Sequence, residues 1–137
     1  MPKIFNARHE ALASEKGEML MGLQVLGTHA VYFEYWVFKP GEQNRELCPG
    51  FKHEQIVYVT AGPIKFRRDG EEFLLEQGQA FHLRSTDKYW LDNPSGVNAA
   101  EICLAGGHTP EGAIHHAAKE PELLKHLRDF MKEHGYL

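Results

Sequence analysis

The residues best suited to chemistry open one short stretch of the chain, HEQIVYVTAG at positions 53–62. His53, Glu54 and Gln55 can transfer protons, form hydrogen bonds or bind metal ions, and they lead directly into an apolar run. The alternation along the run predicts a strand, with Gln55 and Val57 on one face and Glu54 on the other. His53 and Gln55 are therefore expected on the same side of a strand, where they could act on one ligand.

A metal site is one function that these groups could support. A transition metal prefers three or four converging imidazole, thiolate or carboxylate ligands. One possible set combines His53 and Gln55 with His82, and Cys48 is a weaker candidate. The alternative is that His53 ends a strand near solvent, His82 is an ordinary half-buried residue and Cys48 is a small apolar filler.

The elements that would position these residues are predicted to be β-strands. About eight short strands separated by turns are expected between residues 19 and 106. The clearest runs from His29 to Phe38, where both faces are apolar or aromatic except at Glu34. Asp69-Gly70 is the strongest hairpin signal. The pattern predicts an all-β antiparallel sandwich or barrel.

The two ends of the chain differ from this centre. Residues 1–18 are mixed and polar, and we expect an N-terminal arm or edge strand there. Residues 107–137 are expected to form a C-terminal extension with an amphipathic helix at about 121–134, because apolar residues recur at helical spacing. The histidines of this extension are interpreted as surface residues: His108, His115 and His116.

The composition is that of an ordinary globular protein, with 42% hydrophobic and 25% charged residues. The net charge of −4 gives no support for binding to nucleic acid or to a membrane surface. We see no secretory signal and no run long enough to span a bilayer. Two distant cysteines, Cys48 and Cys103, fit a reducing compartment. The expected location is therefore the cytoplasm.

The strand at 53–62 and several turns together resemble the cupin family, whose members are small barrels of two stacked antiparallel sheets. The resemblance covers about residues 20–105, and the turns that support it are Gly41, Asp69-Gly70, Gly78 and Asn93-Pro94. It implies a cupin-type antiparallel double-sheet barrel, or jelly roll, over residues 19–106, followed by a C-terminal α-helix.

The metal ligands of that family do not carry over to this sequence. Cupins hold a divalent metal with a histidine pair, a glutamate and a third histidine. Counting back from Gly62 places Gln55 at the glutamate position, and the histidine pair falls around Cys48 to Phe51, where there is no histidine. Tyr89 stands at the third histidine position. We therefore expect no cofactor; the alternative is one divalent transition metal in a rebuilt site.

A pocket without a metal would need other groups from the barrel. His53, Tyr89 and Glu34 are the candidates for acid–base catalysis. Cations at the barrel mouth would attract an anionic ligand, although they could instead form a solvated rim, with Tyr89 in the core. The expected ligand-binding residues are Gln55, Tyr35, Trp36, Arg45, Arg84 and Lys88.

The function expected from these features is that of a small-molecule-binding cupin without the usual metal ligands. As an enzyme it would be a metal-independent isomerase, dehydratase or cyclase acting on a small anionic or polar metabolite. Two alternatives stay open: a metal-dependent dioxygenase or isomerase, and a non-catalytic sensing or structural module. A homodimer is expected, since cupins often dimerise through their sheets, and no nucleic-acid or membrane partner is expected.

Overall fold

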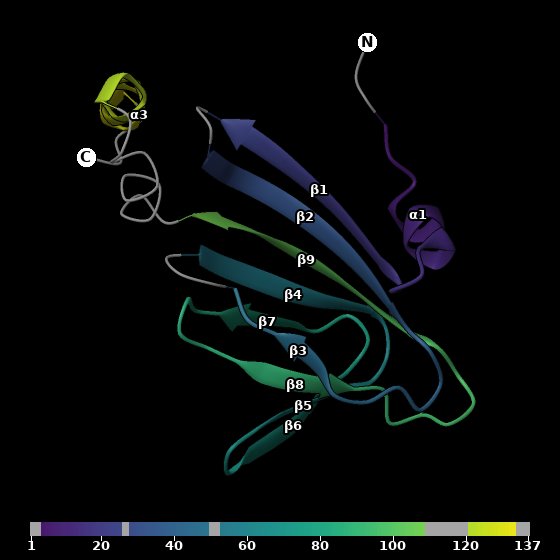
Figure 1. The fold of residues 1–137 in the computed structure, drawn as a ribbon. Coiled ribbons are helices and arrows are strands. Elements are labelled where there is room, and N and C mark those ends of the chain that lie inside the picture. Colours follow the sequence, from purple (N-terminus) through teal and green to yellow (C-terminus); the bar gives the residue numbers. More distant parts are fainter. Residues whose placement is uncertain (1–3, 26–27, 50–52, 109–120, 134–137) are drawn as a thin grey trace.

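The computed structural model describes residues 4–25, 28–49, 53–108 and 121–133, which form two stacked antiparallel sheets and two helices (Figure 1). Among these residues, five strands form the larger sheet in the order β1-β2-β9-β4-β7: β1 (Glu18–Val25), β2 (Thr28–Phe38), β9 (Ala100–His108), β4 (His53–Ala61) and β7 (Ala80–Leu83). The smaller sheet has the order β3-β8-β5-β6: β3 (Arg45–Leu47), β8 (Tyr89–Asp92), β5 (Ile64–Arg68) and β6 (Glu71–Leu75). The predicted all-β, double-sheet architecture is confirmed.

The hydrophobic core lies between the two sheets, because each strand alternates between a buried and an exposed face. On β4, Val57 and Val59 are fully buried, whereas the intervening Tyr58 is exposed. On β2, Trp36 and Phe38 point into the same core. The faces predicted for both strands from alternation are therefore correct.

The register of β2, β9 and β4 arranges the inner face of the larger sheet into rows of neighbouring side chains. The first row is apolar, the second contains one carboxyl group, and the third contains a phenol and an amide around a glycine. The three rows are Trp36–Ile102–Val59, Glu34–Leu104–Val57 and Tyr32–Gly106–Gln55. The barrel thus has an apolar end and a polar end.

The smaller sheet closes the core with aromatic rings. Phe66 and Phe73 stack with their ring centroids 5.2 Å apart, and Phe81 of β7 lies 5.1 Å from Phe73. The predicted hairpin at residues 69–70 joins β5 to β6, where Gly70 has a φ of 71° that suits glycine best.

A short helix replaces the N-terminal arm or edge strand expected before residue 18. Helix α1 (Ala7–Ala13) begins at Asn6, whose side chain accepts a hydrogen bond from the backbone N–H of His9. The helix packs on the outer face of β1 and β2, where Ala11 is fully buried against Met19 and Val37. Figure 1 shows α1 beside the start of β1.

The predicted C-terminal helix is confirmed as α3 (Pro121–Glu133). Neither described helix has the length and apolar content needed to cross a membrane. The expectations for His115 and His116 lie outside the described residues. The homodimer and the cytoplasmic location remain predictions.

Candidate functional site

A pocket of about 220 Å³ lies at the polar end of the barrel. The larger sheet supplies most of its wall, and the segment directly after β3 supplies the rest. Its lining residues are Leu20, Tyr32, Glu34, Cys48, Pro49, His53 and Gln55. We call this the inner pocket. Of the residues predicted from the sequence, it brings together Glu34, Cys48, His53 and Gln55.

The centre of the inner pocket is a carboxyl–amide pair beside a phenol. The Nε2 atom of Gln55 donates a hydrogen bond of 3.3 Å to Oε2 of Glu34. Gln55 is only 4% exposed and Tyr32 only 7%. Within the described chain, Oε1 of Gln55 and the hydroxyl of Tyr32 are buried without a protein hydrogen-bond partner. Buried polar atoms in native proteins nearly always have a partner, so these two oxygens can accept a hydrogen bond from water or from another polar molecule in the pocket.

Burial controls the protonation of both acidic groups in the inner pocket. It raises the pKa of Glu34; the indole of Trp36 lowers this pKa in part, and the charge of Glu18 raises it further. Burial also raises the pKa of Tyr32 to about 12, with Gln55 lowering it and Glu34 raising it. The contact of the Trp36 indole with Glu34 and that of the Tyr32 hydroxyl with Gln55 do not, however, meet the full geometry of a hydrogen bond. Tyr32 therefore stays a neutral phenol at physiological pH.

Gly106 makes room for this arrangement on the middle strand. A Cβ atom at this position would lie 3.0 Å from the Tyr32 hydroxyl and 3.1 Å from Cα of Gln55. The same atom would overlap the carbonyl oxygen of Glu54. Only glycine at this position allows β4 and β9 to approach so closely with the Tyr32 hydroxyl beside them.

The mouth of the inner pocket combines an imidazole, a thiol and apolar groups. The half-buried His53 ring lies 5.8 Å from the Tyr32 ring, measured between centroids. Cys48 is exposed, and Leu20 is 66% exposed on the inner side of the edge strand β1. The pocket is thus reached past β1, where the smaller sheet does not cover the larger one.

Tyr89, predicted as an acid–base residue, lies elsewhere. Its ring is 1% exposed and packs edge-on against Phe66 and Phe81, at 5.8 Å and 5.6 Å. Its hydroxyl donates to Oε1 of Glu71 at 3.3 Å, and the Arg68 guanidinium lies over the ring. The structure therefore places Tyr89 in the core and not in the inner pocket.

The two aromatic residues expected to bind ligand are also outside the inner pocket. Trp36 occupies the apolar row below Glu34. Tyr35 points to the opposite face of β2, where its hydroxyl donates to Glu101 at 2.7 Å. Glu101 also accepts a hydrogen bond from Arg8 of α1, so Tyr35 belongs to the attachment of that helix.

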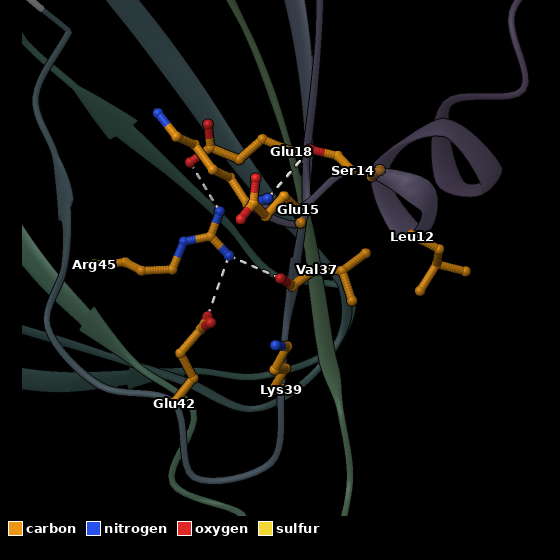
Figure 2. Close-up of a pocket in the computed structure, with 11 residues that line it drawn as sticks. Leu12, Ser14, Glu15, Glu18, Val37, Lys39, Glu42 and Arg45 are labelled. Carbon is orange, nitrogen blue, oxygen red and sulfur yellow. Dashed lines mark hydrogen bonds and ion pairs between the residues drawn. The ribbon is translucent and has the colours of Figure 1, made fainter.

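Two of the three cations expected at the mouth, Arg45 and Lys88, pair with carboxylates elsewhere. Arg45 lies over the Trp36 ring and donates to Val37 O at 2.7 Å, with carboxylates of Glu18 and Glu42 at 2.9 and 3.2 Å (Figure 2). It lines a separate cavity of about 370 Å³ beside α1.

The other two cations lie at the surface of the smaller sheet and its turns. Lys88 pairs with Glu46 at 3.2 Å and lies over the Trp90 ring. Arg84 is exposed at a turn in which its backbone N–H donates to Asp87. The structure thus places none of the three expected cations in the inner pocket.

The metal-ligand set that the sequence offered as an alternative is dispersed over two faces of the larger sheet. His82 lies on the outer face of the larger sheet and pairs with Glu54 at 2.8 Å, so it does not join His53 and Gln55. In the described ranges, no group of three or more His, Cys, Asp or Glu residues could hold a metal ion. The alternative ligand set of His53, Gln55 and His82 is therefore not assembled.

Three residues of the inner pocket were not identified from the sequence: Leu20, Tyr32 and Pro49. A signal for Tyr32 was present, because it stands two residues before Glu34 on the same strand face. Leu20 and Pro49 had no such signal, since their positions depend on how the two sheets meet.

Comparison with family models and with curated proteins finds no match for this chain. Among solved structures, the Schizosaccharomyces pombe Cnp3 cupin domain matches with a TM-score of 0.57 and 9% identity; the match covers 70% of this chain and 64% of that one, just under two thirds of its length. A Cupin 2 conserved barrel domain protein from Salinispora arenicola matches with a TM-score of 0.54 and 11% identity, over 84% of this chain and 86% of that one. The Cupin_2 domain of an XRE family transcriptional regulator from Enterobacter cloacae gives 0.53 and 17%, over 66% and 96%. The chain therefore has the cupin fold, as its strand pattern and turns implied.

Proposed function

We propose that this chain binds a small polar organic molecule in the inner pocket and that Glu34 exchanges a proton with it. The observation that supports this proposal is a pair of buried oxygens beside a half-buried carboxyl group: Gln55 Oε1 and the Tyr32 hydroxyl, which have no hydrogen-bond partner among the residues that the structure describes. A polar molecule in the pocket would satisfy both oxygens and would lie against Glu34.

The size of the inner pocket restricts the ligand. Pockets for drug-sized ligands have volumes of roughly 300–1,000 Å³. The inner pocket, at about 220 Å³, is smaller than that range. This volume corresponds to about seven water molecules in the liquid. The part of the ligand that enters the pocket is therefore a group of few heavy atoms.

Proton transfer is the chemistry best supported by the side chains present. A carboxyl group whose pKa is raised by burial can act as a general acid or base nearer neutral pH. Glu34 would take a proton from the substrate and return it at another atom, while Gln55 holds the carboxyl group in place. The neutral Tyr32 phenol would donate a hydrogen bond to an oxygen that gains negative charge. Isomerisation, dehydration and cyclisation without a metal all use these steps.

Ligand sensing without turnover is a second candidate for the same pocket. It is favoured by the match to a cupin domain of a transcriptional regulator from Enterobacter cloacae. Both candidates require binding in the inner pocket, and they differ only in whether Glu34 moves a proton.

A thermal-shift screen of small polar metabolites tests the binding proposal. A ligand at a hundred times its Kd should stabilise the wild type by about 2.7 kcal/mol. The shift should disappear in Gln55→Leu and persist in Tyr89→Phe, which removes a hydroxyl outside the pocket. If no small metabolite gives a shift that depends on Gln55, the proposal is rejected.

Exchange in heavy water then separates the two candidate functions. Each metabolite that binds is incubated with the protein in D₂O, and deuterium incorporation is followed by NMR. Incorporation with the wild type and not with Glu34→Gln supports catalysis. Binding without incorporation supports sensing.

A further inference from the structure

We infer that the ligand of the inner pocket is a small primary amine, bound as its ammonium ion; this inference rests on the proposed function. The first argument is the charge of the lining. Glu34 supplies a carboxyl group, and among the described residues that line the pocket there is no Lys or Arg. Arg45 of the neighbouring strand β3 is paired with Glu18 and Glu42. The described lining thus has one acidic side chain and, apart from the His53 imidazole, no basic one.

The hydrogen-bonding atoms give the second argument. Gln55 already directs Nε2 to Glu34, so its remaining group is the buried acceptor Oε1. The Tyr32 hydroxyl and the Glu34 carboxylate also offer lone pairs. An ammonium group has three donors and no acceptor, so it matches three oxygen atoms.

Anions and neutral alcohols match these three oxygen atoms less well than an ammonium ion does. An anion would bring a second negative charge beside a half-buried carboxylate, which is unfavourable in a site of low dielectric. A neutral alcohol can accept from the Tyr32 hydroxyl and donate to Gln55 Oε1, but it leaves the negative charge of the half-buried Glu34 carboxylate unpaired.

The aromatic and apolar residues that line the inner pocket also suit the charge and the carbon chain of a primary ammonium ion. Aromatic faces attract ammonium groups, and the Tyr32 and His53 rings stand side by side at 5.8 Å. Leu20 and Pro49 offer apolar surface for a short carbon chain. The volume of about 220 Å³ limits that chain to a few carbons.

Three probes with the same carbon chain test the inference: n-butylamine, n-butanol and butyrate. Binding is followed by NMR through the backbone amide signal of Gly106, which lies between Tyr32 and Gln55. We expect butylamine to bind the wild type at least about tenfold more tightly than butanol, and butyrate to bind most weakly, since hydrogen bonds to charged groups are the stronger ones.

Two variants and one control identify the groups responsible. In Glu34→Gln, which keeps the shape and removes the charge, the Kd of butylamine should rise about tenfold to a hundredfold. In Tyr32→Phe it should rise about threefold to tenfold. Glu71→Gln removes a carboxylate from the opposite sheet and should leave the Kd unchanged.

The outcomes separate the inference from the proposed function. If butanol or butyrate binds as tightly as butylamine, with binding dependent on Gln55, the inference is overturned and the proposed function stands. If no probe perturbs Gly106, the inference is overturned; if the metabolite screen also finds no ligand that depends on Gln55, the proposed function is overturned with it.

Discussion

Glu34 links the inner pocket to the pH dependence of stability. Burial raises its pKa, so the folded chain holds a proton that the unfolded chain releases at lower pH. The contribution of Glu34 to the free energy of unfolding should therefore be fully present below the ordinary carboxyl pKa and should be lost as pH rises through the raised value. Glu34→Gln should flatten this fall in urea titrations between about pH 4 and about pH 8. Glu76→Gln, at an exposed carboxyl group, should keep the wild-type slope, and equal slopes in all three proteins would contradict the expectation.

Gly106 should tolerate no side chain. In Gly106→Ala the new methyl group meets backbone atoms of β4, which cannot move aside, so we expect a loss of about 1–3 kcal/mol in the free energy of unfolding. Gly96→Ala is the matched control, because no atom lies within 4 Å of its added Cβ. Urea unfolding measures both; a Gly106→Ala protein as stable as the control would show that the strands separate easily.

At the scale of single residues, the sequence predicts which face of a strand a residue occupies, but it does not predict which side chains surround that residue. Alternation places Gln55 and Glu34 inside the barrel, and the structure agrees. Tyr89 also faces inward, yet three phenylalanine rings from other strands enclose it. The partners of Arg45 lie up to 27 positions away, so its ion pairs could not be read from local sequence.

At the scale of elements, α1 depends on one small buried residue. Ala11 is fully buried between the helix and the sheet, so Ala11→Leu should overpack the contact and destabilise the fold by about 1–3 kcal/mol. Leu12→Ala, at the neighbouring position that is 50% exposed, should change stability by less than about 0.5 kcal/mol. Hydrogen exchange of the α1 amides should report the same difference, and slow exchange in Ala11→Leu would argue that the helix docks differently.

The two helices show what sequence periodicity can detect. Helix α3 repeats apolar residues at helical spacing over 13 residues, and its position was predicted. Helix α1 has seven residues and buries only Ala11, so no periodic pattern appears. The remaining signal was Asn6, an N-cap residue ahead of a run of helix formers.

At the scale of the whole molecule, the outer face of the larger sheet is the surface on which the proposed homodimer would form. Ile56 and Tyr58 are 53% and 43% exposed there, although sheet faces in contact with water are usually polar. The pair Glu54–His82 beside them supplies a carboxyl group and an imidazole. A second copy related by a two-fold axis would meet the same patch with complementary groups.

Light scattering after gel filtration tests this dimer. The double variant Ile56→Lys, Tyr58→Lys should halve the mass of the wild-type particle, because four lysines would face one another across the axis. Leu74→Lys is the control, since Leu74 is 49% exposed on the smaller sheet. A monomeric wild type would remove the proposal.

The row arrangement of the larger sheet separates what keeps the barrel folded from what it recognises. The row of Trp36, Ile102 and Val59 belongs to the core, whereas Tyr32 and Gln55 stand two rows further along the same strands. Substituting Tyr32 and Gln55, in the row at the polar end of the barrel, would therefore change the preferred ligand and leave the apolar row of the core intact. A library confined to Tyr32, Glu34 and Gln55 would explore new specificities on an unchanged scaffold, which is how one barrel could diverge to serve many metabolites.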